Sequence, residues 1–105
     1  MARKSAVEKS EKQIQSDVLA YLKQLPCCKA YKIISANERG VADILLCYKG
    51  QFVAFETKRP RKDLEPIQAA QFKLINQAGG YAFRIRSKQE AIEAITLIDL
   101  ERYGL

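Results

Sequence analysis

The segment VADILLCYKGQFVAFETK, residues 41–58, contains two strand-like apolar runs that are separated only by Lys49 and Gly50. Two such runs joined by two residues, the second of them glycine, are typical of a β-hairpin with a tight turn. In that hairpin Tyr48 pairs with Gln51, and the residue numbers of every facing pair add up to 99. This one turn therefore predicts the register of two neighbouring strands.

The predicted register brings two acidic residues together. Asp43 faces Glu56 with the two Cβ atoms about 5 Å apart, and Lys58 follows on the same face, because side chains two residues apart in a strand share a face. Two carboxylates at that separation repel each other by roughly 3 kcal/mol at an effective dielectric constant of about 20. A Mg²⁺ ion held by carboxylates, water and a substrate phosphate would offset this repulsion.

Two other arrangements are compatible with the same residues. Lys58 alone can neutralise one acid in a surface ion-pair cluster, without a metal. A one-residue bulge would turn Asp43 and Glu56 to opposite faces of the sheet. The pattern favours a metal-binding acid pair and leaves both alternatives open.

The segments on either side of the hairpin predict three helices and two further strands. These are a helix from Ser10 to Leu25 that Pro26 ends, a strand over 30–36, a helix over 64–78 that Gly79 and Gly80 end, a strand over 81–86, and a last helix capped by Ser87. The resulting order is α-β-β-β-α-β-α. It predicts an α/β (α+β) fold in which helices flank a small mixed sheet.

Length and composition are those of one globular domain, which we expect to span residues 1–105. Hydrophobic residues make up 48% and charged residues 29% of the chain, as in soluble proteins. No apolar run approaches the roughly 20 residues that cross a membrane, and the N-terminus lacks the apolar stretch of a secretory signal. We therefore expect a cytoplasmic protein.

The chain contains no histidine, which excludes Ser-His-Asp and Cys-His triads and His-ligated metal sites. Its three cysteines, Cys27, Cys28 and Cys47, lack the spacing of a zinc site or a disulfide framework. We expect them to be ordinary buried or half-buried thiols. Enzymatic chemistry would therefore have to come from carboxylates, lysine, hydroxyls or a metal with oxygen ligands.

The net charge of +6 is unevenly distributed. Residues 1–75 contain 14 Lys and Arg against 8 Asp and Glu, whereas residues 76–105 contain four of each kind. Basic surfaces attract polyanions, of which nucleic acid is the commonest inside cells. The charge distribution is compatible with nucleic-acid binding and equally with a role in solubility.

Further candidate residues flank the acid pair. Glu11 lies three residues before Ile14, on the packed side of the first helix, and can supply a third acid, although an acid in a first helical turn also suits the helix dipole. Glu8 competes with Glu11 for that role. Gln68 lies in the first part of the second predicted helix, where it borders an apolar stripe made of Ile67, Ala70 and Leu74.

Two groups of basic residues are candidates for DNA contacts. Arg59, Arg61 and Lys62 follow Lys58 directly, in a loop that could hold phosphates beside the attacked one. Arg84 and Arg86 alternate with apolar residues, so both lie on one face of the last predicted strand. A solvated charged surface is the alternative for each group.

Taken in order, four elements of the sequence resemble the site motif of the PD-(D/E)XK nuclease superfamily. They are Glu11, the GVAD segment (40–43), the ETK segment (56–58) and Gln68. More narrowly, nearly the whole chain resembles the small stand-alone VRR-NUC proteins of phages and bacteria. Ala42 stands where that family often has proline, and the last strand reads FRIRS (83–87) rather than a plain VRR.

The resemblance implies a restriction-endonuclease-like fold and Mg²⁺- or Mn²⁺-dependent hydrolysis of phosphodiester bonds in DNA. For stand-alone members it also implies a homodimer that acts on branched DNA such as four-way (Holliday) junctions, in a bacterial or phage-infected cell. The catalytic residues would be Asp43, Glu56, Lys58 and Gln68. The metal ligands would be Glu11, Asp43, Glu56 and the backbone carbonyl of Thr57.

Two other functions are compatible with the same sequence. One is a DNA-binding protein that keeps the fold without cutting DNA. In such a DNA-binding protein, two facing acids beside a polyanion would serve no purpose. The other is a sequence-specific restriction-type endonuclease, for which 105 residues leave little room for a recognition subdomain.

Overall fold

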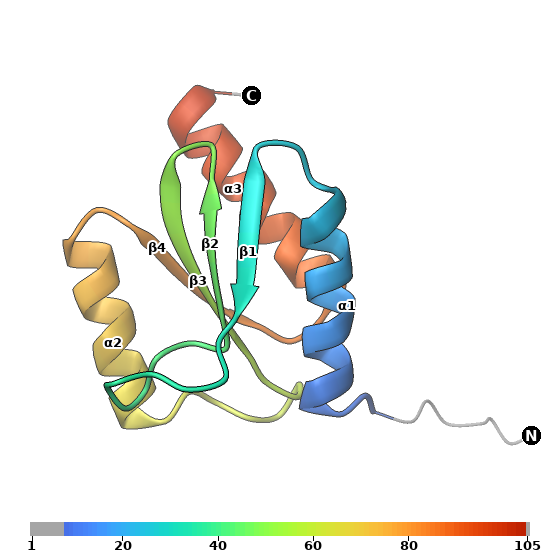
Figure 1. Ribbon diagram of the computed structural model, residues 1–105, viewed down its shortest axis with the longest axis vertical. Helices are drawn as coiled ribbons and strands as arrows, with labels where there is room; N and C mark the ends of the chain where they lie inside the picture. Colours follow the sequence, from blue (N-terminus) through green and yellow to red (C-terminus); the bar gives the residue numbers. More distant parts are fainter. Residues whose placement is uncertain (1–7, 105) are drawn as a thin grey trace, which may run out of the picture.

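The computed structural model describes residues 8–104 (Figure 1). Its elements, in chain order, are α1 (Glu11–Gln24), β1 (Cys28–Lys32), β2 (Ile44–Tyr48), β3 (Gln51–Thr57), α2 (Pro66–Gln77), β4 (Tyr81–Ile85) and α3 (Lys88–Tyr103). The predicted order α-β-β-β-α-β-α is confirmed.

The four strands form one mixed sheet in the order β1-β2-β3-β4. The pairs β1–β2 and β2–β3 are antiparallel, and β3–β4 is parallel. Parallel neighbours require a crossover, which α2 provides between β3 and β4. The fold class predicted from the sequence, a mixed sheet flanked by helices, is therefore confirmed.

The hairpin turn gives the central strands their register. Lys49 has φ +50° and Gly50 has φ +82°, as a two-residue type I′ turn requires. Tyr48 pairs with Gln51, and the register continues without a bulge to Ile44 and Phe55. Every facing pair has the predicted sum of 99, so the bulged alternative is wrong.

The hydrophobic core lies between one sheet face and the helices α1 and α3, which pack against each other. Ser10 and Ser87 cap these helices, since each serine oxygen accepts a hydrogen bond from the backbone N–H three residues later. Their inward residues meet alternate residues of the central strands in a cluster that includes Val18, Leu22, Ile44, Val53, Phe55, Ile95 and Ile98.

The opposite face of the sheet is only partly covered. Helix α2 lies on that side, against β4 (Figure 1), and none of its residues is buried. The apolar stripe predicted for this helix is wrong: Ile67, Ala70 and Leu74 are exposed. The helix instead turns Gln68, Phe72 and Ile75 inward, each half-buried. A hydrogen bond from Gln68 to Glu56, described below, joins this side of the helix to the sheet.

The first strand is shorter than predicted. β1 ends at Lys32, opposite Ile44, and the 30–36 prediction was wrong beyond that point. Ile33 N still donates to Asp43 O at 2.7 Å, but Ile34 is 90% exposed. With no partner strand to satisfy its backbone, the chain leaves the sheet and forms a loop as far as Asp43.

The three cysteines carry free thiols. Cys28 is half-buried, as expected, but Cys27 and Cys47 are exposed, which corrects the expectation for these two. Cys27 lies in the turn before β1, and Cys47 projects from the sheet face that α2 leaves open. Within residues 8–104, no helix combines the length and the apolarity that crossing a bilayer would need.

Candidate active site

Three charged residues meet where β2 begins and β3 ends. Asp43 directly precedes β2, Glu56 is the penultimate residue of β3, and Lys58 directly follows that strand. Glu56 is only 4% exposed and Lys58 only 6%. The loops 33–43 and 58–65, which flank these residues, lie at the same end of the sheet (Figure 1). The fold thus brings the acids and the lysine together at one end of the central strands.

Hydrogen bonds orient both carboxylates. Asp43 N donates to Glu56 Oε1 at 3.2 Å. Thr57 donates twice to Asp43 Oδ2, from its backbone N at 3.1 Å and from Oγ1 at 2.7 Å. Each acid is therefore tied to the strand that carries the other, and neither can turn away without breaking these bonds.

Gln68 connects the acid pair to α2. Its Nε2 donates to Glu56 Oε2 at 3.0 Å, while its Oε1 accepts a hydrogen bond from Glu65 N at 2.9 Å. The second bond is half of a capping box in which the Glu65 side chain accepts from the Gln68 backbone. The cap of the helix thus holds the amide in place against the acid.

Lys58 supplies the positive charge nearest to the pair. Its Nζ lies 3.6 Å from Glu56 Oε2. Its backbone N donates to Ile85 O at 2.9 Å, which continues the parallel pairing one residue beyond β3. The predicted placement of Lys58 on the same face as Glu56 is therefore confirmed.

Burial and the neighbouring acid make ionisation of Glu56 costly. Burial first, and then the negative charge of Asp43, raise the pKa of Glu56 from an ordinary 4.5 to about 7, against the opposing effects of Lys58 and the Asp43 N–H. At neutral pH the site therefore holds a carboxyl group that is only partly ionised. A cation at this position would favour its charged form.

The oxygen donors present fit a hard divalent cation. Among the described residues, Asp43 Oδ1 accepts no hydrogen bond, and each Glu56 oxygen keeps lone-pair capacity beyond its single donor. Mg²⁺ commonly takes one or two carboxylates and fills its other positions with water and phosphate. Asp43 and Glu56 can provide these ligands, with the Thr57 carbonyl predicted as a third.

The structure does not gather a third acid at this site. Within residues 8–104 there is no group of three or more His, Cys, Asp or Glu side chains that could hold a metal. Glu11 is half-buried at the start of α1, and Glu8 is exposed before it. A ligand role for Glu11 stays a prediction, as does the choice between it and Glu8.

The side chain of Thr57 was missed by the sequence reasoning, which used only its carbonyl. Its hydroxyl donates to Asp43, and the residue is fully buried. A signal was present in the sequence: Thr57 continues the buried run of β3, and a buried hydroxyl needs a hydrogen-bond partner. The predicted register did not identify the acceptor, because it places Thr57 on the face of the sheet opposite Asp43.

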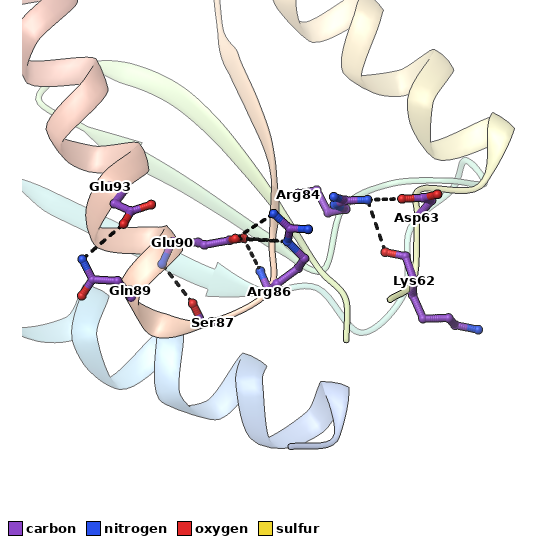
Figure 2. Close-up of polar contacts among 8 residues, drawn as sticks. All are labelled: Lys62, Asp63, Arg84, Arg86, Ser87, Gln89, Glu90 and Glu93. Carbon is purple, nitrogen blue, oxygen red and sulfur yellow. Dashed lines mark hydrogen bonds and ion pairs between the residues drawn. The ribbon is translucent and has the colours of Figure 1, made fainter. Parts of the chain in front are cut away.

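The two groups of basic residues lie in different surroundings. Arg59, Arg61 and Lys62 are exposed in the loop after β3. Arg84 instead donates to the Asp63 carboxylate and, at 3.4 Å, to the Lys62 carbonyl, and Arg86 contacts Glu90 through Nε at 3.1 Å and through Nη2 at 2.9 Å (Figure 2). The two strand arginines are therefore already paired with acids.

Comparison with known proteins is informative at the level of structure. No family model matches the chain, and no curated protein matches its sequence. A solved structure described as a VRR_NUC domain superposes with a TM-score of 0.69 over 89% of this chain and 96% of its own. The fold is that of a VRR-NUC domain.

Sequence identity to that VRR-NUC structure is 18%, so the match establishes the fold. It confirms the fold expected from the resemblance of the sequence, and it places the acid pair within a VRR-NUC-like sheet. The roles of the individual residues rest on the geometry described above.

Proposed function

We propose that this chain is a Mg²⁺- or Mn²⁺-dependent endodeoxyribonuclease. The observation that carries the proposal is the acid pair of half-buried Asp43 and buried Glu56, joined by a hydrogen bond, with the pKa of Glu56 raised to about 7. The VRR-NUC fold and the net charge of +6 support it, since DNA is a polyanion.

The finer parts of the proposal come from the resemblance of the sequence. We propose a homodimer that acts on branched DNA such as four-way junctions, in the cytoplasm. The motif from Glu11 to Gln68 that carries the resemblance extends over most of the chain, and the fold agrees with it.

Each residue of the site has a role in the proposed reaction. A bound Mg²⁺ or Mn²⁺ ion would supply an activated water and offset charge on the attacked phosphate. Asp43 and Glu56, with the Thr57 carbonyl, would hold the ion, and Thr57 N–H and Oγ1 would orient Asp43. Glu11 could join them as a ligand only if its side chain moved to the acid pair.

Lys58 and Gln68 act on the reacting groups. The Lys58 ammonium, beside Glu56, can donate to the attacking water or to a phosphate oxygen and so position it. As a cation it has no lone pair with which to accept the proton of the water. Gln68 holds Glu56 and can orient the water through the same amide.

A non-catalytic DNA-binding protein on the same fold is the main alternative. The acid pair argues against it, because two neighbouring carboxylates, one of them buried, weaken binding to a polyanion and raise the cost of folding.

The test is a cleavage assay on duplex, flap, splayed and four-way-junction DNA, with Mg²⁺, Mn²⁺ or EDTA. We expect metal-dependent nicks, strongest on the branched substrates. Asp43→Asn and Glu56→Gln should lose more than about 100-fold in activity, since even the outer partners of a bound metal commonly contribute 10–100-fold. Both variants should still bind DNA, and bind it slightly more tightly after losing a negative charge.

Glu93→Gln is the matched control. Glu93 is an exposed α3 acid whose one polar contact in the described chain is with Gln89, at 3.4 Å (Figure 2). This variant should cut like the parent protein. Full cleavage by Asp43→Asn would overturn the assignment. Binding of DNA that is the same with metal and with EDTA, without any cleavage, would favour the non-catalytic DNA-binding protein.

A further inference from the structure

A basic groove runs between α1 and β1, outside the acid pair. It has a volume of about 520 Å³, and its polar lining consists of Lys12, Gln15, Ser16, Lys23 and Lys32. No acidic residue lines it. Three positive charges therefore face one groove without an opposing charge in its walls.

Helical spacing places the lysines of α1 in one row. Lys12, Ser16 and Lys23 are four and then seven residues apart, so they lie on the same side of the helix. Asp17 lies on the opposite flank, where it accepts a hydrogen bond from Lys9 at 2.6 Å. The acid that might have neutralised the groove is thus turned away from it and already paired.

The three lysines are exposed, and within residues 8–104 none of them forms an ion pair. This distinguishes them from Arg84 and Arg86, which both hold acids. The groove is therefore a place where the described surface keeps positive charge free for an external anion.

One end of the groove meets the candidate active site. Lys32 is the last residue of β1, and the next residue, Ile33, donates its N–H to the carbonyl of Asp43 at 2.7 Å. Lys12 is in the first turn of α1, at the same end of the sheet as the loops that flank the acids (Figure 1). From there the row continues along α1 to Lys23.

We infer that this groove binds the phosphate backbone of the DNA on one side of the cleaved bond, with Lys12, Lys23 and Lys32 as its phosphate contacts. Lys12 and Lys23 are separated by about 16 Å along the helix axis. At about 3.4 Å per base pair, that distance covers roughly five base pairs of duplex. The groove would set the direction in which the substrate leaves the active site.

This inference rests on the proposed function and is tested by a triple variant, Lys12→Ala, Lys23→Ala and Lys32→Ala. The matched control is Lys29→Ala, Lys73→Ala and Lys88→Ala, which removes three exposed lysines from other surfaces and changes the net charge equally. DNA binding is measured by fluorescence anisotropy in EDTA, over salt concentrations from roughly 50 to 200 mM.

We expect the groove variant to bind on the order of 10²–10³-fold more weakly at low salt and to lower the slope of log K against log salt by about three, one for each lost phosphate contact. The control should change the slope by less than about one. Equal slopes for the two variants, with a parent protein that binds and cuts DNA, would overturn the groove and leave the nuclease intact. A parent protein that does not bind DNA would overturn both.

Discussion

The charged residues of the adjacent strands β3 and β4 have opposite surroundings. Arg84 on β4 and Arg86 directly after that strand each form an ion pair with an acid at the surface. On β3, Glu56 is buried beside the charge of Asp43, and the one ion pair that it forms in the described chain is with Lys58. Arg84 is the register partner of Glu56, yet it pairs with Asp63 instead. The fold thus neutralises the arginines and leaves the acid pair one positive charge short.

The two regions differ in how much their charges cost the folded state. Exposed ion pairs such as those of β4 contribute only about 0–1 kcal/mol each. The acid pair makes a far larger demand, since the change in the pKa of Glu56 from 4.5 to about 7 corresponds to roughly 3 kcal/mol. This cost destabilises the folded protein, and a cation bound at the acid pair would offset it.

We expect the largest effect, a loss of cleavage activity, for Lys58→Ala. Removal of its ammonium takes away the group that positions the water, so activity should fall by about 10²–10⁴-fold while the metal ligands remain. Single-turnover cleavage measures the loss, and Lys73→Ala, at an exposed position of α2, serves as the control. Normal cleavage by Lys58→Ala would show that the lysine only balances charge.

The next effect is on stability. Because the folded pKa of Glu56 is raised, the native state holds its proton over a window in which the unfolded state has released it. The contribution is present in full below about pH 4.5 and should be lost as the pH rises through about 7, by roughly 3 kcal/mol in EDTA. Glu56→Gln should abolish this loss, as urea unfolding at several pH values would show.

Glu90 should show the opposite pH dependence when urea unfolding is measured at several pH values. Although burial acts to raise the pKa of Glu90, its hydrogen bonds with Arg86 and the arginine charge outweigh burial and hold it below the ordinary value. Its contribution is therefore present above the unfolded pKa and lost as the pH falls through the folded one. Glu90→Gln should therefore reduce the loss of stability at acid pH. Identical curves of unfolding free energy against pH for Glu56→Gln and Glu90→Gln would contradict the predicted difference between these two acids.

The smallest effect concerns the two groups of arginines. Arg59→Ala with Arg61→Ala removes two exposed cations and should weaken DNA binding several-fold, with a salt slope lower by about two. Arg84→Ala with Arg86→Ala removes cations that already hold Asp63 and Glu90, so the slope should change by less than about one. A larger change for the strand pair would mean that these arginines exchange their acids for phosphates.

The acid pair could be predicted from sequence because its position depends on one local turn. Lys49 and Gly50 fix the register of β2 and β3 through backbone conformation, and Asp43, Glu56 and Lys58 follow by counting. The fold class followed from the same hairpin and from the helix caps at Ser10 and Ser87.

Features that depend on long-range packing were harder to predict. The apolarity of Ile67, Ala70 and Leu74 suggested the wrong buried side of α2, because the helix also carries Phe72 and Ile75, which lie on the inward side with Gln68 and its hydrogen bond to Glu56. The end of β1 depends on where its partner strand stops. The hydroxyl of Thr57 was visible in the sequence, but its acceptor became evident only with the folded strands.

The binding of a divalent cation by Asp43 and Glu56 can be measured directly by titration calorimetry with Mn²⁺ and Mg²⁺. The titration would be performed on the parent protein, on Asp43→Asn and on the Glu93→Gln control at neutral pH. We predict saturable binding by the parent and the control, and none by Asp43→Asn. Equal binding by all three proteins, or none by the parent, would contradict the account.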